Sequence, residues 1–211
     1  QRPFRKGFNL LAAYNYNRER NETFFNADEE YAGRFFWMPV TTPRHRLSVA
    51  AVVELPFGKG RPLLGDLSPA LEAIVGGWQL SSLVSWQSGD LLTFGQMEAS
   101  GDPTIDDPTP QRWFRTEGFA RAIAYTPRTN PRFYPGLRGP GLFNWDGTVS
   151  KFFPVRERFR LELRAETYNV TNLLARANPS TSVTDALFGK TLKPREYTFG
   201  RQLQYSLKLH F

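Results

Sequence analysis

Hydrophobic and polar residues alternate along six stretches of the chain, a pattern typical of β-strands whose two faces meet different surroundings. The six stretches are 7–17, 45–57, 78–87, about 143–153, 159–168 and 198–211. In the clearest stretch, 159–168, every second residue is charged or phenolic. Only Arg201 interrupts the apolar face of the last stretch. The pattern predicts an all-β, antiparallel fold with about six long strands.

The segments between these stretches alternate in length. Three are long, at 18–44, 89–142 and 170–197, whereas 154–158 is a short turn. Segment 58–77 is intermediate, but Ser68 followed by Pro69, with Gly76 after an apolar run, predicts one short helix over 68–75. Segment 89–142 is rich in turn signals, and we expect short strands in it around 112–125.

Composition agrees with strands and turns. The 211 residues include 17 glycines and 16 prolines, too many for long helices, and no cysteine, which excludes disulfides and thiolate metal sites. The net charge of +7 comes from basic residues spread along the chain rather than gathered in a patch, so we expect no nucleic-acid partner. No stretch is apolar enough for a transmembrane helix. The start at Gln1 suggests a processed chain or a fragment.

A soluble β-sandwich produces the same alternation, so strand length and aromatic placement decide between the two environments. The stretches run ten to fourteen residues, whereas strands of globular proteins centre on about five or six and bilayer-crossing strands need roughly nine to eleven. Trp78 and Trp86 share one face and lie roughly 20 Å apart in height, close to the spacing of the two aromatic girdles of outer-membrane barrels. We therefore predict a transmembrane β-barrel segment in the bacterial outer membrane. With the C-terminus in the periplasm, the long loops are extracellular and the short helix is periplasmic.

Several sequence motifs resemble one family of outer-membrane receptors. LRGPGLFNWD at 137–146, SKFF at 150–153 and RLELRAETYNVTN at 160–172 are similar to the barrel end of Oar-like TonB-dependent receptors. HRL at 45–47, ELPFGKG at 54–60, GGWQL at 76–80 and WQSG at 86–89 resemble the preceding strands, so the resemblance covers roughly 40–211. Gly147 departs from the pattern, since an apolar lipid-facing residue is usual there.

The resemblance implies that residues 1–211 are the C-terminal part of a receptor barrel of about 22 strands, without the plug and N-terminal domains. It implies energy-coupled uptake of a bulky nutrient, such as a siderophore, an oligosaccharide or a peptide. The implied partners are outer-membrane lipid and lipopolysaccharide, the plug domain and missing strands, and the TonB complex, reached through the absent N-terminal part. Two alternatives stay open: a soluble carbohydrate-binding module that stacks sugars on Trp and Tyr, and a small structural outer-membrane barrel built from several copies.

The last strand resembles the assembly signal that the barrel-insertion machinery reads by strand pairing. Its residues are Leu203, Tyr205, Leu207, Leu209 and the terminal Phe211.

Loop 89–142 is the candidate ligand site, because aromatic and arginine side chains together can stack on a ligand and donate to it. The candidate residues are Arg112, Trp113, Phe114, Arg115, Tyr125, Arg132 and Tyr134. Packing of these aromatics against the barrel rim is an equally good interpretation. The inward charges are expected to line the lumen and to pair with a plug or with one another, rather than to contact the substrate directly; they are Arg160, Glu162, Arg164, Glu166 and Lys208.

No pattern predicts chemistry. Gly58-Lys59-Gly60 lacks the spacing of a phosphate loop and is better explained as a turn. His45 and His210 lie on different strands without a partner motif. Asp102, Asp106 and Asp107 have the carboxylates that calcium prefers, but an acidic loop tip explains them more simply. We expect no enzyme, no cofactor and no metal site.

Overall fold

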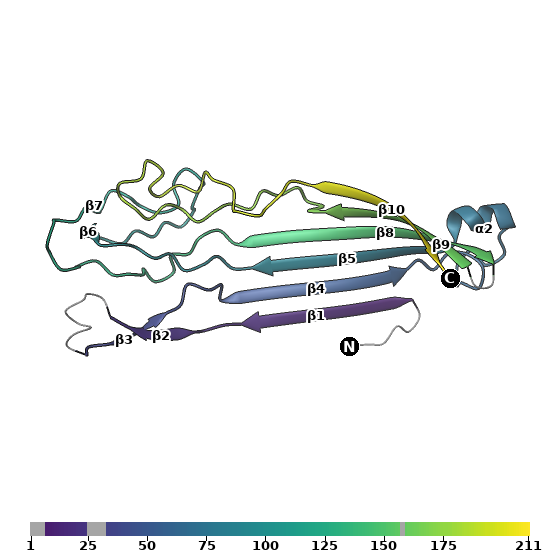
Figure 1. The fold of residues 1–211 in the computed structure, drawn as a ribbon, viewed down its shortest axis with the longest axis horizontal. Helices are drawn as coiled ribbons and strands as arrows, with labels where there is room; N and C mark the ends of the chain where they lie inside the picture. The colour runs from purple at the N-terminus through teal and green to yellow at the C-terminus, as the bar shows by residue number, and fades with distance from the viewer. Residues whose placement is uncertain (1–6, 25–32, 157–158) are drawn as a thin grey trace.

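The computed structural model describes residues 7–24, 33–156 and 159–211. Its main element is one antiparallel six-stranded sheet in which strands adjacent in the sheet follow one another along the chain (Figure 1). The strands, in spatial order, are β1 (Phe8–Tyr16), β4 (His45–Glu54), β5 (Trp78–Gln87), β8 (Leu142–Arg156), β9 (Phe159–Tyr168) and β10 (Gln202–His210). The predicted all-β fold and its six long strands are confirmed.

The connections separate to the two ends of the sheet. At one end lie the long loops, which carry a hairpin of β2 (Arg20–Thr23) with β3 (Phe36–Pro39) and a second of β6 (Met97–Ala99) with β7 (Phe119–Arg121) (Figure 1). At the other end lies α2 (Pro69–Val75). β7 falls inside the range where short strands were expected. None of the helices in the described ranges is long and apolar enough to span a bilayer.

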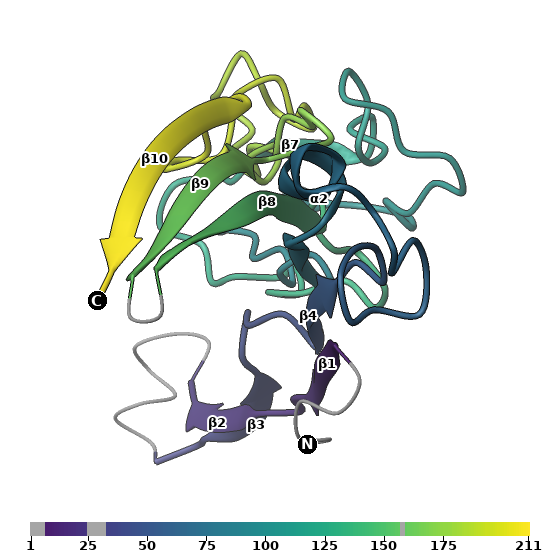
Figure 2. The same cartoon turned by 90° about the vertical axis from the view of Figure 1, so that its right-hand side faces the viewer.

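The strand registers bring most of the apolar residues of the six strands onto one face of the sheet. Val84 is paired with Val49 on one side and with Trp145 on the other, and Leu207 is paired with Leu163. Because side chains alternate between faces, most of the intervening residues, which point to the opposite face, are polar. Ser82 and Lys151 are polar residues on the apolar face, and Leu83 and Phe152 are apolar residues on the polar face. Seen along its strands, the sheet bends into an open arc with β1 and β10 at its two ends (Figure 2).

Two predicted strand boundaries are wrong, each for a local reason. β4 ends at Glu54 rather than at residue 57, because Pro56 has no N–H to donate to the sheet. β10 begins at Gln202 rather than at 198, because the backbone N–H of Arg201 donates to the Asn172 side chain at 2.9 Å. Arg201 therefore lies outside the strand and does not interrupt its apolar face. β8 is longer than expected and runs through Gly147 without interruption.

The predicted helix is confirmed with its caps. The Ser68 side chain accepts from the Leu71 N–H at 3.5 Å, and Pro69 occupies the first helical position. The preceding turn packs tightly on the helix, because a Cβ at Gly58 would lie 2.6 Å from the Glu72 carboxylate. That carboxylate accepts the Lys59 N–H at 2.8 Å. Gly58-Lys59-Gly60 is thus a turn, as expected.

The buried apolar core lies away from the sheet. Large apolar side chains on the strands are widely exposed, including Leu80, Trp86, Val149, Leu163 and Tyr205. Within the described residues, the cluster of buried apolar side chains lies in the long loops, at Leu92, Phe94, Met97, Phe114, Tyr134 and Leu137. A single-layer sheet with an exposed apolar face needs an apolar surrounding other than protein.

Candidate functional site

The long loop between β5 and β8 leaves and rejoins the sheet through a narrow stem. A Cβ at Gly89 would lie 1.7 Å from the carbonyl oxygen of Gly139, so the two chain segments approach too closely for any side chain there. Across the stem, the Gly139 N–H donates to the Asp90 carbonyl at 2.8 Å and the Arg138 guanidinium donates to the Gly89 carbonyl at 3.0 Å. Asp90 also pairs with Arg195 of the next long loop at 3.4 Å.

Asn169 forms the stem of the second long loop, between β9 and β10. It is buried and has a left-handed backbone, with φ at 53°, a conformation that asparagine tolerates better than most residues. Its side-chain amide donates to the carbonyls of Leu173 and Phe199 at 3.1 Å each, and its N–H donates to the Asp146 carboxylate at 2.9 Å. The Asn169 side chain therefore ties the start of this loop to its end, and the Asn169 backbone N–H ties it to β8.

The two long loops fold together. The Trp113 N–H donates to the Gly189 carbonyl at 2.7 Å, and the Thr191 N–H donates to the Pro110 carbonyl at 2.8 Å. The Trp113 indole N–H donates to the Arg138 carbonyl at 2.7 Å. We call residues 88–141 together with 169–201 the loop assembly.

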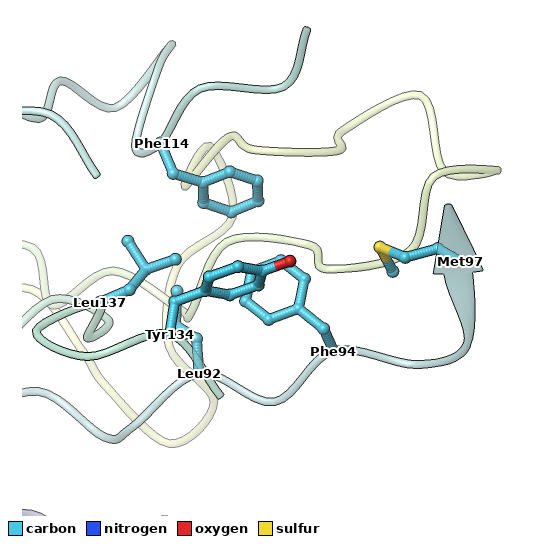
Figure 3. Close-up of a cluster of buried hydrophobic side chains, with 6 residues drawn as sticks. All are labelled: Leu92, Phe94, Met97, Phe114, Tyr134 and Leu137. Atoms are coloured by element: carbon cyan, nitrogen blue, oxygen red, sulfur yellow. The ribbon is translucent and has the colours of Figure 1, made fainter. Parts of the chain in front are cut away.

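Aromatic rings form the core of the loop assembly (Figure 3). Phe94 lies edge-on to Phe114 at 5.4 Å and to Tyr134 at 5.1 Å between ring centroids, the favoured geometry for aromatic pairs. Phe119 and Phe188 pack against the same cluster, and Phe188 comes from the second loop. The Tyr134 hydroxyl is buried without a hydrogen-bond partner among the described residues, and burial raises the pKa of Tyr134.

Three of the seven predicted ligand residues belong to this aromatic core or pack against it. Phe114 has 0% exposure and Tyr134 is buried, so neither ring is available for stacking in this structure. Trp113 is half-buried. The packing interpretation therefore has direct structural support for these three aromatic residues, and their ligand role stays a prediction.

The other predicted ligand residues lie nearer the surface of the loop assembly. Arg112 and Arg115 are exposed, and Arg112 pairs with Glu117 at 2.7 Å. Arg132 is half-buried, and its backbone carbonyl accepts the Phe94 N–H at 3.0 Å. Tyr125 is fully exposed. The structure thus does not bring the seven residues together into one ligand site.

Tyr125 instead borders a pocket of about 540 Å³ that the sequence did not indicate. Its backbone has φ at 61°, unusual for an aromatic residue. The pocket lies between the β6–β7 hairpin and the second long loop, and its wall includes Gln96, Arg121, Tyr125, Thr126, Thr181, Ser182 and Thr184. Hydroxyl, amide and guanidinium groups beside an exposed ring can donate to and stack on a polar ligand.

On the polar face of the sheet, several of the predicted inward charges pair within the wall. Arg164 pairs with Glu166 at 2.7 Å. Glu162 is buried, accepts from the Ser150 hydroxyl at 3.1 Å and lies 2.9 Å from the His210 ring nitrogen. Among the predicted inward charges, Arg164 and Glu166 therefore pair with each other, whereas Glu162 contacts Ser150 and His210.

The apolar face carries the predicted girdle and assembly residues. Trp78 and Trp86 share this face at opposite ends of β5, and Trp86 is paired with Leu47 and Phe143. Leu203, Tyr205, Leu207 and Leu209 lie on the same face of the edge strand β10, where they are all exposed, as is Phe211 just beyond it. Their role as an assembly signal stays a prediction.

Metal ligation has no geometric support in 7–24, 33–156 and 159–211, where no group of three or more His, Cys, Asp or Glu side chains converges. The Asp102 carboxylate instead accepts the backbone N–H and the hydroxyl of Thr104, both at 2.9 Å. These hydrogen bonds lower the pKa of Asp102.

A curved single-layer sheet with one exposed apolar face and one polar, partly ion-paired face is the wall of a transmembrane β-barrel. The chain belongs to the outer membrane β-barrel domain family, whose model matches residues 1–204. The protein is therefore placed in the bacterial outer membrane, and the soluble carbohydrate-binding alternative is wrong. No curated protein and no solved structure has a significant match to the chain.

Proposed function

We propose that this chain is the C-terminal barrel part of an Oar-like TonB-dependent receptor, which imports a bulky nutrient. The observation that carries the proposal is the open six-stranded sheet, whose edges β1 and β10 have no neighbouring strand among the described residues. Unpaired backbone groups are not tolerated in hydrocarbon, so further strands must close this wall. A barrel of about 22 strands around a plug accommodates them.

The motifs that resemble this receptor family support the proposal, because they coincide with the loop stems. Gly89 ends the WQSG motif, Gly139 lies in LRGPGLFNWD, and Asn169 lies in the YNVTN end of the β9 motif. Each makes a close backbone approach or a set of hydrogen bonds that holds a long loop at the end of a strand. The motifs therefore specify how the large loops attach to the wall, a requirement of a receptor that captures ligands from outside.

In this proposal the loop assembly is extracellular and α2 is periplasmic, as in barrels with long outer loops and short inner turns. The polar face of the sheet meets a plug domain, and the N-terminal part of the receptor contacts the TonB complex. The barrel-insertion machinery recognises β10 by strand pairing. Outer-membrane lipid and lipopolysaccharide surround the apolar face, and the chain has no catalytic role.

Within the loop assembly, the pocket beside Tyr125 is our candidate for first contact with the nutrient. The Tyr125 ring is fully exposed, whereas the rings of Phe114 and Tyr134 are buried in the core of the loop assembly. Arg121 and Gln96 line the same pocket, and the Gln96 side chain is already held by the Thr126 carbonyl. The same lining also includes the apolar residues Met97, Ile123 and Val183. Polar and apolar groups beside an exposed ring suit an oligosaccharide, which presents both kinds of surface.

The test is growth of the source bacterium on a panel of nutrients supplied as sole iron, carbon or nitrogen source. The strains are wild type, a deletion of the full-length receptor and a deletion of the TonB protein. We expect the receptor deletion to lose growth on one nutrient class, the TonB deletion to lose growth on the same class, and the Tyr125→Ala receptor to show reduced uptake at low nutrient concentration. Normal growth of the receptor deletion on every nutrient, or uptake that continues without TonB, would contradict the proposal.

A further inference from the structure

The turn between β4 and β5 lies on the outer, convex side of the sheet (Figure 2). The Trp78 indole N–H donates to the Ile74 carbonyl at 2.9 Å, and the Lys151 ammonium donates to the Gly76 carbonyl. Trp78 and Lys151 are direct register partners, and Trp78 belongs to the apolar face. The C-terminal end of α2 is therefore attached to the lipid-facing side of the barrel wall.

The turn exposes aliphatic side chains beside this lipid-facing surface. Leu63, Leu64, Leu71 and Ile74 are each at least half exposed, and Ile74 reaches 67%. Leu64 has φ at 56°, a left-handed backbone that a branched residue rarely adopts. Exposed aliphatic residues next to a lipid-facing band are typical of segments that lie in the membrane interface. The membrane, with which the neighbouring face is already in contact, accounts for their exposure.

A cavity of about 790 Å³ opens between this turn and the end of β8. Its apolar lining includes Phe57, Leu67 and Phe153, and its charged lining consists of Lys59, Arg61, Asp66, Glu72 and Lys151. The cavity therefore presents charges of both signs beside apolar walls, within the size range of small-molecule sites.

Three of the five charges, those of Arg61, Glu72 and Lys151, are already engaged, and the Lys151 ammonium donates to the Gly76 carbonyl. Arg61 pairs with Glu54 at 2.6 Å, and Glu72 accepts the Lys59 backbone N–H at 2.8 Å. Within the described residues, the side chains of Lys59, Lys151 and Asp66 form no ion pair. Lys151 is only 3% exposed and lies between the rings of Trp78 and Phe153, at 5.3 and 5.2 Å from their centroids. One cation, Lys59, and one carboxylate, Asp66, thus remain for a ligand.

We propose that this cavity binds the headgroup of one phosphatidylethanolamine molecule from the periplasmic leaflet of the outer membrane. The phosphate lies at Lys59, and the ammonium group lies at Asp66. Lysine recognises phosphate as a point charge, and a headgroup with one charge of each sign matches the unpaired charges of the lining. Leu71 and Ile74 insert among the acyl chains. The site rests on the periplasmic placement of α2 made above, and it does not depend on the transported nutrient.

The test is native mass spectrometry of the full-length protein purified from outer membranes in detergent. The probes are phosphatidylethanolamine, phosphatidylglycerol and diacylglycerol with matched acyl chains, and lipid A. We expect one retained phosphatidylethanolamine, with about tenfold weaker retention of diacylglycerol, because charge-assisted hydrogen bonds to the headgroup are lost. Lys59→Ala should weaken the retention of both phospholipids, whereas Asp66→Ala should weaken the retention of phosphatidylethanolamine alone. Lys193→Ala, an exposed lysine in the loop assembly, is the matched control and should bind as wild type.

Equal retention of diacylglycerol and phosphatidylethanolamine would overturn the headgroup site, as would wild-type binding by both Lys59→Ala and Asp66→Ala. Preferred retention of lipid A would overturn the periplasmic placement and the site with it. Heat-modifiable migration on gels confirms that each variant is folded, and Lys59→Gln and Asp66→Asn replace any alanine variant that is not. Nutrient growth is measured separately, so loss of lipid retention with normal TonB-dependent growth overturns only this inference.

Discussion

The barrel wall and the loop assembly differ in whether their apolar side chains are buried by other protein atoms. In the wall, the side chains of Leu80, Val149 and Leu163 are exposed, because no second layer of protein covers the sheet. In the loop assembly, Phe94 and Phe114 are completely or almost completely buried by other side chains. The wall lies in hydrocarbon, which replaces a protein core, whereas the loops extend into water and need a core of their own. Aromatic side chains in one chain therefore face lipid in the wall and pack against one another in the loop assembly.

The loop core should be the most sensitive part of this comparison. Phe114→Ala removes a fully buried ring that contacts Phe94, Phe119 and Phe188, and should destabilise the loop assembly by about 3–5 kcal/mol. Hydrogen exchange of the full-length protein in detergent should show faster exchange of loop amides and unchanged protection of the strands. The control Ile123→Ala, at a 65% exposed side chain, should change little. Equal loss of protection in the strands would show that wall and loops unfold as one unit.

The wall should instead be sensitive to charge on one face only. Val84 lies on the apolar face between Val49 and Trp145, whereas its neighbour Ser85 lies on the polar face. An arginine near the bilayer midplane costs about 2–4 kcal/mol on the lipid-facing side, so Val84→Arg should reduce the yield of folded barrel sharply. Ser85→Arg should have a mild effect. Heat-modifiable migration of the full-length protein from purified outer membranes measures the folded yield of both variants. A lower folded yield for Ser85→Arg than for Val84→Arg would show that the lipid-facing and lumen-facing sides are assigned the wrong way round.

The junction between wall and loops should respond to a smaller extent. Asn169→Ala leaves the carbonyls of Leu173 and Phe199 without their donor and should cost about 1–3 kcal/mol. We expect limited proteolysis to cut 170–201 faster while the strands stay intact. Asn178→Ala removes an exposed contact of 3.3 Å to Asp90 and serves as the control, with an expected change within about 0.5 kcal/mol. Equal proteolysis of the two variants would remove the stem role from Asn169.

The smallest predicted effect, that of Tyr134→Phe, is a gain rather than a loss of stability in the loop assembly. The Tyr134 hydroxyl is buried without a hydrogen-bond partner in the described part of the chain, so Tyr134→Phe should leave the loop assembly unchanged or stabilise it by up to about 1 kcal/mol. Hydrogen exchange under the conditions used for Phe114→Ala gives the comparison. A clear destabilisation would show that the hydroxyl makes an interaction in the membrane-bound protein.

Local patterning was sufficient to predict the wall. β5 and β9 begin and end where their alternation predicts, since each residue on a strand faces either lipid or lumen and the sequence records this choice directly. The errors fall at strand ends, where Pro56 and the hydrogen bond from Arg201 to Asn172 override the pattern. The short helix was predicted correctly because its signals, Ser68, Pro69 and Gly76, lie within a few residues of one another.

The sequence by itself determined the six long strands, their faces and the outer-membrane environment, because a strand in a bilayer is specified by residues two apart. Only the tertiary structure decided the fate of the loop aromatics, since burial of Phe114 depends on Phe94, 20 positions before it, and on Phe188 from another loop. Alternation cannot distinguish an aromatic residue that stacks on a ligand from one that packs on another ring. Contacts between distant segments make that distinction, and the same is true of the pocket beside Tyr125 and the cavity beside α2, each of which is formed by segments far apart in the chain.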